Sequence, residues 1–548
     1  MYKSRWEVKP YHKQLAFDNS MELKRFIRNG ITLIIIFVLF SVKLSAQDTI
    51  TFTWQAKGDR ALGIEATEDF TVNWGDGTIE KKNSTFTFYL YHTYTTQKEY
   101  TVTIATSTLD GRFTTFHTSL SGATYYQISS LTLTGCHGLQ ILSCWNNQLT
   151  HLDLTGCPDL QSIDCENNQL TGLDLTECPD LQSIDCRNNQ LTGLDLSGCR
   201  DLQSIDCRNN QLTRLDLSGC PNLTHLGCSY NQITGLDLSG CPDLQSIDCG
   251  SNQLTHLDLT GCPNLRGLNC GNNQLTHLDL SGCPNLQYLA CNNNQLIHLD
   301  LNECPYLQSI DCNNNQLTHL DLTGCPNLQI LNFDHNQLTE IDLTGCPNLR
   351  GLNCGNNQLQ LSDLFAAHLL INNPNGKRLG TQNLQPQTAI LGEALFSEQS
   401  VFNGIFTNYS VIRNGNPASE SDYTVIDGKL IFNAVGKYTV TITNDAIVSN
   451  ENAPAKVIVE ITVEEGTGIA EYKQNNLTVY PNPATAEIHV KLNSHETVNY
   501  AIYNPAGQPV LHGRLQGETT INVESLSKGV YYINFDGERN TTVSFIKN

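Results

Sequence analysis

Apolar residues recur with a period of 21 residues through the middle of the chain, from about Leu131 to Leu361. In residues 160–180, leucine, isoleucine and cysteine occupy repeat positions 1, 4, 6, 11, 14, 16 and 19, and nearly all other positions are polar. A fixed period of this length is typical of stacked supersecondary units. We therefore predict a solenoid of about 11 turns, in which each turn buries its apolar face only against its neighbours and both ends need caps.

Position 9 is asparagine in every turn, from Asn147 to Asn357. An inward asparagine can bond backbone groups of its own and adjacent turns that would otherwise be buried unpaired. We interpret this row as a structural ladder. Because stacked strands lie roughly 4.8 Å apart, the turns predict a rod about 50 Å long.

This repeat resembles the leucine-rich repeat pattern L-x-x-L-x-L-x-x-N-x-L, with cysteine in place of the third leucine. It is most similar to the internalin-related bacterial surface proteins, whose 21-residue repeats carry the same cysteine. The resemblance implies a mainly β fold with a concave strand face that recognises partners.

All 21 cysteines belong to the repeats, in two rows at positions 6 and 19, and Phe333 replaces cysteine once. We interpret them as buried, reduced thiols, because free cysteine packs as a small hydrophobe. Disulfides are disfavoured because neighbouring Cβ atoms in a parallel stack point the same way. Zinc is disfavoured because no C-x-x-C pair is present.

Residues 1–46 are predicted to be an upstream extension and a signal peptide. A start at Met21 places three basic residues before the apolar run 31–42, and small residues follow. The run is too short to span a bilayer comfortably. We expect the mature protein to begin near Gln47; the start at Met1 or Met21 stays open, and the alternative is a retained N-terminal anchor.

Two β modules flank the repeats, which with their caps are predicted to cover residues 126–370. Residues 47–125 alternate with period two, as in Glu99–Ile104, which is typical of strands. The motif Val72–Thr78 (VNWGDGT) resembles the PKD-type immunoglobulin-like domain, with Asp76 interpreted as a turn residue rather than a metal ligand. Residues 371–466 predict a second immunoglobulin-like sandwich.

The last segment, 467–548, carries three ordered motifs: VYPNPA at 479–484, IYNPAG at 502–507 and LSKGVYYI at 526–533. These resemble the C-terminal sorting domain of type IX secretion cargo. The resemblance implies contact with the outer-membrane secretion machinery, removal of the domain, attachment to surface lipopolysaccharide, and a cell-surface or extracellular location. The alternative is one more adhesive β module.

The chain is acidic, with 54 acidic and 32 basic residues and a net charge of −22. Between Leu131 and Leu361 there are 24 acidic residues, 6 arginines and no lysine. Phosphate binding needs basic clusters, so a nucleic-acid partner is disfavoured.

Position 15 carries an outward row of aspartates, which we call the aspartate row. Unit charges about 4.8 Å apart repel by roughly 0.9 kcal/mol even in water-like dielectric, so we expect the row to attract cations or to titrate at raised pKa. Calcium is one expectation; a solvated face relieved by backbone or Thr/Ser hydrogen bonds is the other. We expect four neighbouring histidines to soften the row by hydrogen bonding, with metal binding as the alternative. The calcium candidates are Asp258, Asp279, Asp300 and Asp321, and the histidines are His256, His277, His298 and His319.

Positions 3, 5, 7 and 8 face solvent on the strand face. Aromatic residues and arginine anchor many interfaces, so those found here are candidates for partner binding, together with the acids beside them. The candidates are Trp145, Asp164, Glu166, Asp185, Arg187, Asp206, Arg208, Tyr230, Asp248, Tyr288, Asp311 and His335.

No catalytic motif is present: there is no nucleophile elbow, zinc-protease helix, Walker loop or dinucleotide fingerprint. We therefore predict a non-enzymatic adhesion protein without a cofactor, which recognises a protein or glycan on host or neighbouring cells and supports attachment and biofilm. The alternative is a surface receptor that captures a soluble peptide or glycan nutrient. A passive surface-layer component is a third possibility.

Overall fold

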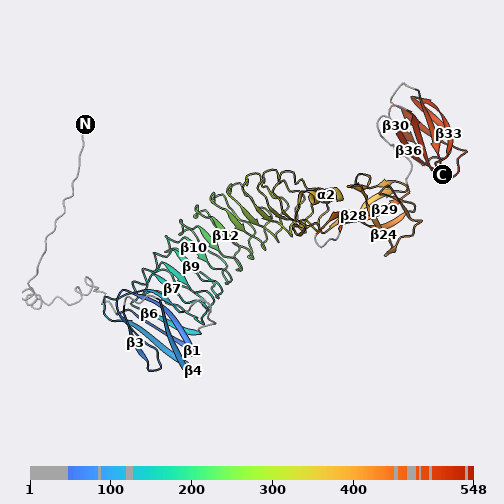
Figure 1. Cartoon of the computed structure of the whole chain (residues 1–548). Coiled ribbons are helices and arrows are strands. Elements are labelled where there is room, and N and C mark those ends of the chain that lie inside the picture. The colour runs from blue at the N-terminus through green and yellow to red at the C-terminus, as the bar shows by residue number, and fades with distance from the viewer. Residues whose placement is uncertain are drawn as a thin grey trace, which may run out of the picture.

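The computed structural model describes residues 47–83, 88–118, 127–449, 454–465, 477–480, 483–492, 497–505, 507–536 and 541–548. The predicted signal segment lies outside the described residues. Figure 1 shows a β module at one end of a curved rod of stacked turns, with further β modules following it in chain order. Among the described residues, no helix combines the length and apolarity needed to cross a membrane.

The first module is built on two long antiparallel strands, β1 (Thr49–Ala66) and β4 (Phe88–Thr106). Its core includes Trp54, which is fully buried and meets Tyr94 edge to face at 5.8 Å. Asp76 accepts a hydrogen bond from the backbone N–H of Thr78 at 2.9 Å, as its interpretation as a turn residue requires. The remaining strands are β2 (Phe70–Asn73), β3 (Ile79–Lys82), β5 (Phe113–His117) and β6 (Ile128–Thr134).

The repeats form a parallel sheet of three-residue strands, which confirms the prediction of about 11 turns. In each strand the central residue is buried, and its neighbours are partly or fully exposed except Ser143 in β7. Equivalent residues pair, as Ile163 does with Ile184. The strands are β7 (Ile141–Ser143), β8 (Ser162–Asp164), β9 (Ser183–Asp185), β10 (Ser204–Asp206), β11 (His225–Gly227), β12 (Ser246–Asp248), β13 (Gly267–Asn269), β14 (Tyr288–Ala290), β15 (Ser309–Asp311), β16 (Ile330–Asn332) and β17 (Gly351–Asn353).

Both ends of this sheet are covered by neighbouring elements. At the first end, β5 pairs in parallel with β7, so the first module donates a strand to the solenoid. At the other end, β18 (Lys377–Arg378) pairs with β17, and helix α2 (Leu361–Leu370) buries Leu361, Leu364 and Ala367. The buried core is therefore continuous from the first module through the repeats into the module that follows.

The asparagine ladder has the predicted role. Asn252 donates through Nδ2 to the carbonyls of Cys228 (3.0 Å), Cys249 (3.1 Å) and Gly250 (3.3 Å), and its Oδ1 accepts the N–H of Ile233 at 2.9 Å. One side chain thus satisfies four buried backbone groups, two in its own turn and two in the preceding turn, which would otherwise each destabilise the fold.

The cysteines are all free and buried, as predicted. Several thiols donate to backbone carbonyls, such as Cys178 Sγ to the carbonyl of Cys157 at 3.5 Å. Burial raises the pKa of these thiols, for instance that of Cys241 to about 11. The thiolate that metal binding or nucleophilic chemistry needs is therefore disfavoured.

The module after the repeats has one larger sheet and two small ones. Its two longest strands, β28 (Gly436–Val448) and β29 (Pro454–Glu464), pair antiparallel. The other elements are β19 (Thr381–Asn383), β20 (Gln387–Ile390), β21 (Ala394–Leu395), β22 (Val401–Phe402), β23 (Ile405–Phe406), β24 (Asn408–Arg413), β25 (Asn416–Pro417), β26 (Tyr423–Ile426), β27 (Lys429–Phe432), and the 3-10 helices η1 (Pro374–Gly376) and η2 (Ser397–Gln399).

The C-terminal module has a separate core around Ile488, Ile502 and Phe545. One sheet contains β30 (Leu477–Tyr480), β31 (Glu487–Leu492) and β34 (Glu518–Asn522), and the other contains β32 (Thr497–Tyr503), β33 (Pro509–Gln516), β35 (Gly529–Asp536) and β36 (Thr541–Lys547).

Candidate functional site

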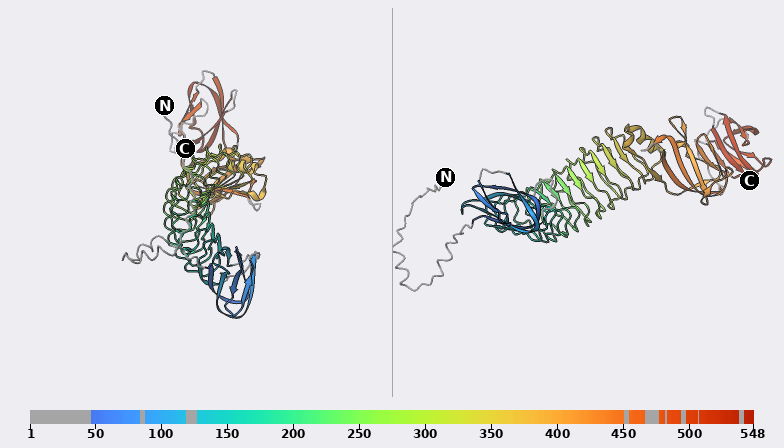
Figure 2. Two further views of the ribbon diagram at one scale, coloured as in Figure 1. Left: turned by 90° about the vertical axis from the view of Figure 1, so that its left-hand side faces the viewer. Right: turned by 60° about the horizontal axis from the view of Figure 1, so that its bottom comes forward.

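The strand face of the solenoid carries most of the candidate residues. Figure 2 shows the turns stacked side by side along the rod, so that equivalent positions form rows. Since side chains alternate along a strand, the buried residue at position 4 leaves positions 3 and 5 outside the core.

A network of charged side chains crosses this face from β8 to β12. Arg187 Nη2 lies 2.9 Å from Glu166 Oε2 and 2.7 Å from Asp185 Oδ2, and Arg187 Nε lies 3.3 Å from Asp206 Oδ2. Arg208 continues the network, with Nε donating to Asp206 Oδ1 at 2.8 Å. The structure thus brings together candidate partner-binding residues that are spread in the sequence from Glu166 to Asp248.

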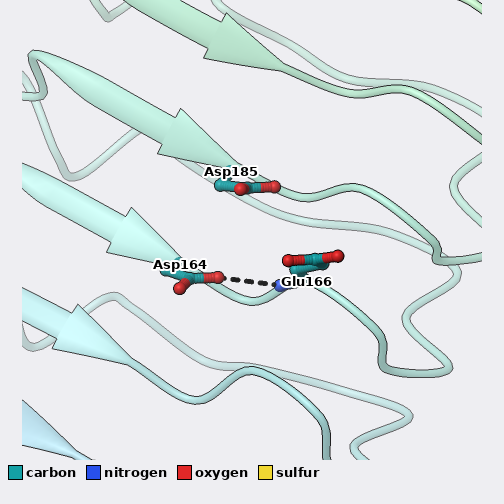
Figure 3. A group of neighbouring side chains, drawn as sticks. All are labelled: Asp164, Glu166 and Asp185. Carbon is teal, nitrogen blue, oxygen red and sulfur yellow. Dashed lines mark hydrogen bonds between the residues drawn. The ribbon is translucent and has the colours of Figure 1, made fainter. Parts of the chain in front are cut away.

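The acidic end of the network gathers Asp164, Glu166 and Asp185, whose ligand atoms lie within 4.8 Å of one another (Figure 3). Glu166 donates its backbone N–H to Asp164 Oδ1 at 3.2 Å. The guanidinium of Arg187 already bonds two of the three carboxylates, so the group has a built-in counter-ion. We therefore interpret it as an ion-pair network and not as a metal centre.

Asp164 is the least compensated member of this group. The pKa of Asp164 is raised to about 6, chiefly by burial and in addition by the nearby carboxylates of Asp185 and Glu166, while the Glu166 N–H and Arg187 lower it. By contrast, hydrogen bonding to Asp185 raises the pKa of Arg187 and holds that side chain charged.

Gly227 interrupts the run of aspartates at repeat position 5, between Asp206 and Asp248, and makes room for the side chain of Arg208. A Cβ at Gly227 would lie 3.0 Å from Asp206 Oδ1 and 3.4 Å from Arg208 Nε. Without that atom, Arg208 extends past β11 until its Nη1 lies 3.6 Å from Asp248 Oδ2, two turns from Asp206. The glycine therefore lets one arginine bridge acids that are not in adjacent turns.

Tyr230 stands next to this bridge in a strained backbone conformation. Position 8 adopts a left-handed conformation throughout the solenoid, and most turns place asparagine there. Tyr230 holds the same conformation, with φ of 55°, although tyrosine is disfavoured in this region. Its side chain is 65% exposed, so core packing does not explain the choice of residue. Such outliers concentrate at functional positions.

A hollow of about 490 Å³ lies beside Tyr230 and Arg208. It exists because nearby turns carry small residues on this face, including Ser229, Gly250 and Ser251. The hollow therefore combines an exposed aromatic ring, two arginines and an acid in one concave place.

The other candidates lie outside this hollow. Trp145 is only half-buried, and Asp311 accepts a hydrogen bond from Asn332 Nδ2 at 2.9 Å. Tyr288 is 53% exposed farther along the strand face. His335 holds a strained left-handed backbone like that of Tyr230, and its ring bonds Asp334 at 2.6 Å.

A second hollow, of about 570 Å³, lies at the C-terminal end of the strand face. The exposed Ile330 and the arginines Arg350 and Arg378 line it. Sequence reasoning missed Arg378 because it lies beyond the repeat period and reaches the sheet only through β18.

The expectation of raised pKa values in the aspartate row is wrong. Hydrogen bonds from the Thr or Ser two residues later lower the pKa of the carboxyls; for Asp258 the donors are the backbone N–H and hydroxyl of Thr260 at 3.0 and 2.8 Å. These short bonds to the ionised form outweigh repulsion between solvated neighbours. The pKa is lowered for Asp153, Asp174, Asp195, Asp216, Asp237, Asp258, Asp279, Asp321 and Asp342.

The role expected of the histidine row also needs correction. His256 and His319 act on Asp258 and Asp321 through charge, while the hydrogen bonds come from threonine. His277 instead bonds the hydroxyl of Thr276 at 3.0 Å. Among the described residues, the calcium candidates of the aspartate row do not gather into a three-ligand group.

Comparisons with known proteins assign two parts of the chain. Residues 179–219, 221–262 and 326–366 match the family model for leucine-rich repeats, and residues 478–548 match that for the secretion system C-terminal sorting domain. The middle of the chain is a leucine-rich repeat solenoid. Such a sorting domain indicates export across the outer membrane to the cell surface or extracellular space. No curated protein matches the chain.

Three solved structures illustrate the similarity. The functional domain of InlJ from Listeria monocytogenes, which includes a cysteine ladder, is 25% identical over 62% of this chain and 84% of its own, with a TM-score of 0.44. YopM from Yersinia enterocolitica is 28% identical over 45% and 56%, with a TM-score of 0.38. The PEPR1–AtPEP1 complex is 22% identical over 48% and 43%, with a TM-score of 0.40. Since all three scores are below 0.5, the repeat assignment rests on the family model and the geometry above.

Proposed function

We propose that this chain is a non-enzymatic adhesion protein that is displayed on the cell surface and binds a protein or glycan of host or neighbouring cells. The observation that carries the proposal is the hollow beside Tyr230 on the strand face. Leucine-rich repeat solenoids are binding scaffolds, and the sorting domain directs this one outside the cell.

The composition of the hollow supports partner binding. Exposed tyrosine and arginine are the residues that most often dominate interface energetics. Tyr230 keeps a strained backbone and an exposed ring, and Arg187 and Arg208 are held in place by carboxylates before any partner arrives. Such preorganisation lowers the entropy that binding would otherwise lose.

The flanking modules complete the proposal. We assign the first module as PKD-like and the module after the repeats as immunoglobulin-like, with the latter, next to the anchored end of the chain, holding the rod away from the cell. After export, the sorting domain is removed and the mature chain is attached to surface lipopolysaccharide.

A deletion strain tests this function. We expect it to lose attachment, aggregation or biofilm, and expect complementation by the wild-type chain to restore the lost behaviour. Complementation with Arg208→Ala/Tyr230→Ala should fail although protease accessibility shows normal display. Unchanged attachment in the deletion strain would contradict adhesion, whereas loss of growth on a peptide or glycan nutrient would support a capture receptor.

A further inference from the structure

A second groove runs along the solenoid at repeat positions 12–17, which follow the asparagine ladder and are separate from the strand face. It has a volume of about 1290 Å³ and spans five turns. Its floor is a row of leucines at position 14 that are between 2% and 8% exposed: Leu152, Leu173, Leu194, Leu215 and Leu236.

Three of the five turns that line the groove have no side chain at position 13, and the other two carry His151 and Arg214 there. Gly172, Gly193 and Gly235 stand there, and a Cβ added to any of them would meet no atom within 4 Å. These glycines are therefore not required by close packing. From His256 to His319 the later turns carry histidine at the same position, and the groove ends before these turns.

One wall of the groove is acidic. Asp174, Asp195, Asp216 and Asp237 line it, against the single arginine Arg214, which gives a formal charge of −3 without histidine. The turn-forming hydrogen bonds of these aspartates use Oδ1, and among the described residues none is found to Oδ2. Four of the five turns thus offer one carboxylate oxygen beside an apolar strip.

We propose that this groove binds an extended segment of a partner protein in which apolar and lysine or arginine side chains alternate. The apolar side chains contact the leucine floor, and the basic ones pair with the aspartates. Five turns spaced by roughly 4.8 Å cover about 19 Å, which is the length of about six extended residues.

Charge and geometry favour this occupant over two others. A metal ion needs several ligands in one place, but the described aspartates of this row do not form a three-ligand group. A neutral glycan donates hydroxyl hydrogen bonds to carboxylates but forms no ion pair with the acidic wall. Basic side chains need only one carboxylate each, which is what four of the five turns provide.

The test measures fluorescence anisotropy of the labelled peptide Lys-Val-Lys-Val-Lys-Val with the full mature chain, at low and high salt. We expect saturable binding that weakens with salt. Gly172→His/Gly193→His/Gly235→His fills the groove and should weaken binding at least about tenfold. The variant should fold, because four later turns place histidine at this position.

Two triple variants, each with three Asp→Asn changes in the aspartate row, distinguish binding in this groove from general electrostatic attraction to an acidic protein. Asp174→Asn/Asp195→Asn/Asp216→Asn should weaken binding and reduce its salt dependence, whereas Asp279→Asn/Asp300→Asn/Asp321→Asn, the same change in turns with histidine, should have little effect. The variant His256→Gly/His277→Gly/His298→Gly lengthens the groove and should bind a ten-residue probe more tightly.

Equal weakening of binding by the two triple Asp→Asn variants would overturn the proposal. Unchanged binding by the triple Gly→His variant would also overturn it. So would equally tight binding of a Ser-Val peptide of the same length. The strand-face variant Arg208→Ala/Tyr230→Ala should bind the probe normally. The groove and the proposed adhesion site can therefore fail independently.

Discussion

At the scale of single residues, Tyr230 shows the clearest conflict between the side chain present and the backbone conformation that it adopts. Most turns have asparagine at position 8, where the backbone is left-handed, because asparagine tolerates this conformation. Tyrosine, which tolerates it poorly, stands at this position in Tyr230. Tyr230→Asn restores the residue that the fold prefers. We expect the free energy of unfolding to rise by about 0.5–1 kcal/mol. Urea unfolding of both chains measures this, and a lower stability of the variant would show that the ring supports the fold.

Asp164 should make stability depend on pH. Its folded pKa of about 6 lies above the ordinary value of an unfolded aspartate. Its contribution is therefore present at low pH and is lost as pH rises through 6. Asp164→Asn should stabilise the protein at pH 8 by about 1 kcal/mol, after allowance for solvent screening, and have almost no effect at pH 4.

The matched control for this change is Asp185→Asn in the next turn. It removes a carboxylate bonded to Arg187, so we expect lower stability at pH 8. Urea midpoints at both pH values provide the measurement. If Asp164→Asn had the same effect at pH 4 and pH 8, the assigned titration would be wrong.

At the scale of elements, the pairing of β5 with β7 makes the first module the N-terminal cap of the solenoid. A chain that lacks residues 47–117 leaves the backbone groups of β7 unpaired at an exposed edge, which promotes association. We expect oligomers in sedimentation velocity and a lower urea midpoint. A chain that lacks residues 477–548 should stay monomeric, because that module has a core of its own. A monomer of unchanged stability without residues 47–117 would contradict the capping role.

The elements also show what the sequence can and cannot predict. The turns of the solenoid could be predicted from rows of inward residues, such as Asn147 to Asn357, because each repeat must bury the same positions. The pairing of β5 with β7 could not be predicted from the sequence, because no local pattern marks which strand of the first module pairs with the repeats. The hollow beside Tyr230 depends on the small residues Ser229, Gly250 and Ser251 and on a backbone angle, and neither can be read from hydrophobic periodicity. For the aspartate row, Coulomb repulsion was overestimated relative to the hydrogen bonds of Thr260 and its equivalents.

At the scale of the whole molecule, the chain combines a rigid acidic rod, a capping module and an export tail. Its continuous core joins the first module, the repeats and the following module, so the strand face is held as one surface. The acidic composition favours partners with basic surfaces, and added salt should slow their association.

The most direct test of the account compares binding of the purified mature wild-type chain and its Tyr230→Asn variant to intact target cells, with urea unfolding measured on the same samples. The account predicts that the variant is at least as stable as the wild type and binds cells at least about tenfold more weakly. Full binding by a stable, correctly folded variant would contradict the claim that the strand face around Tyr230 holds the partner.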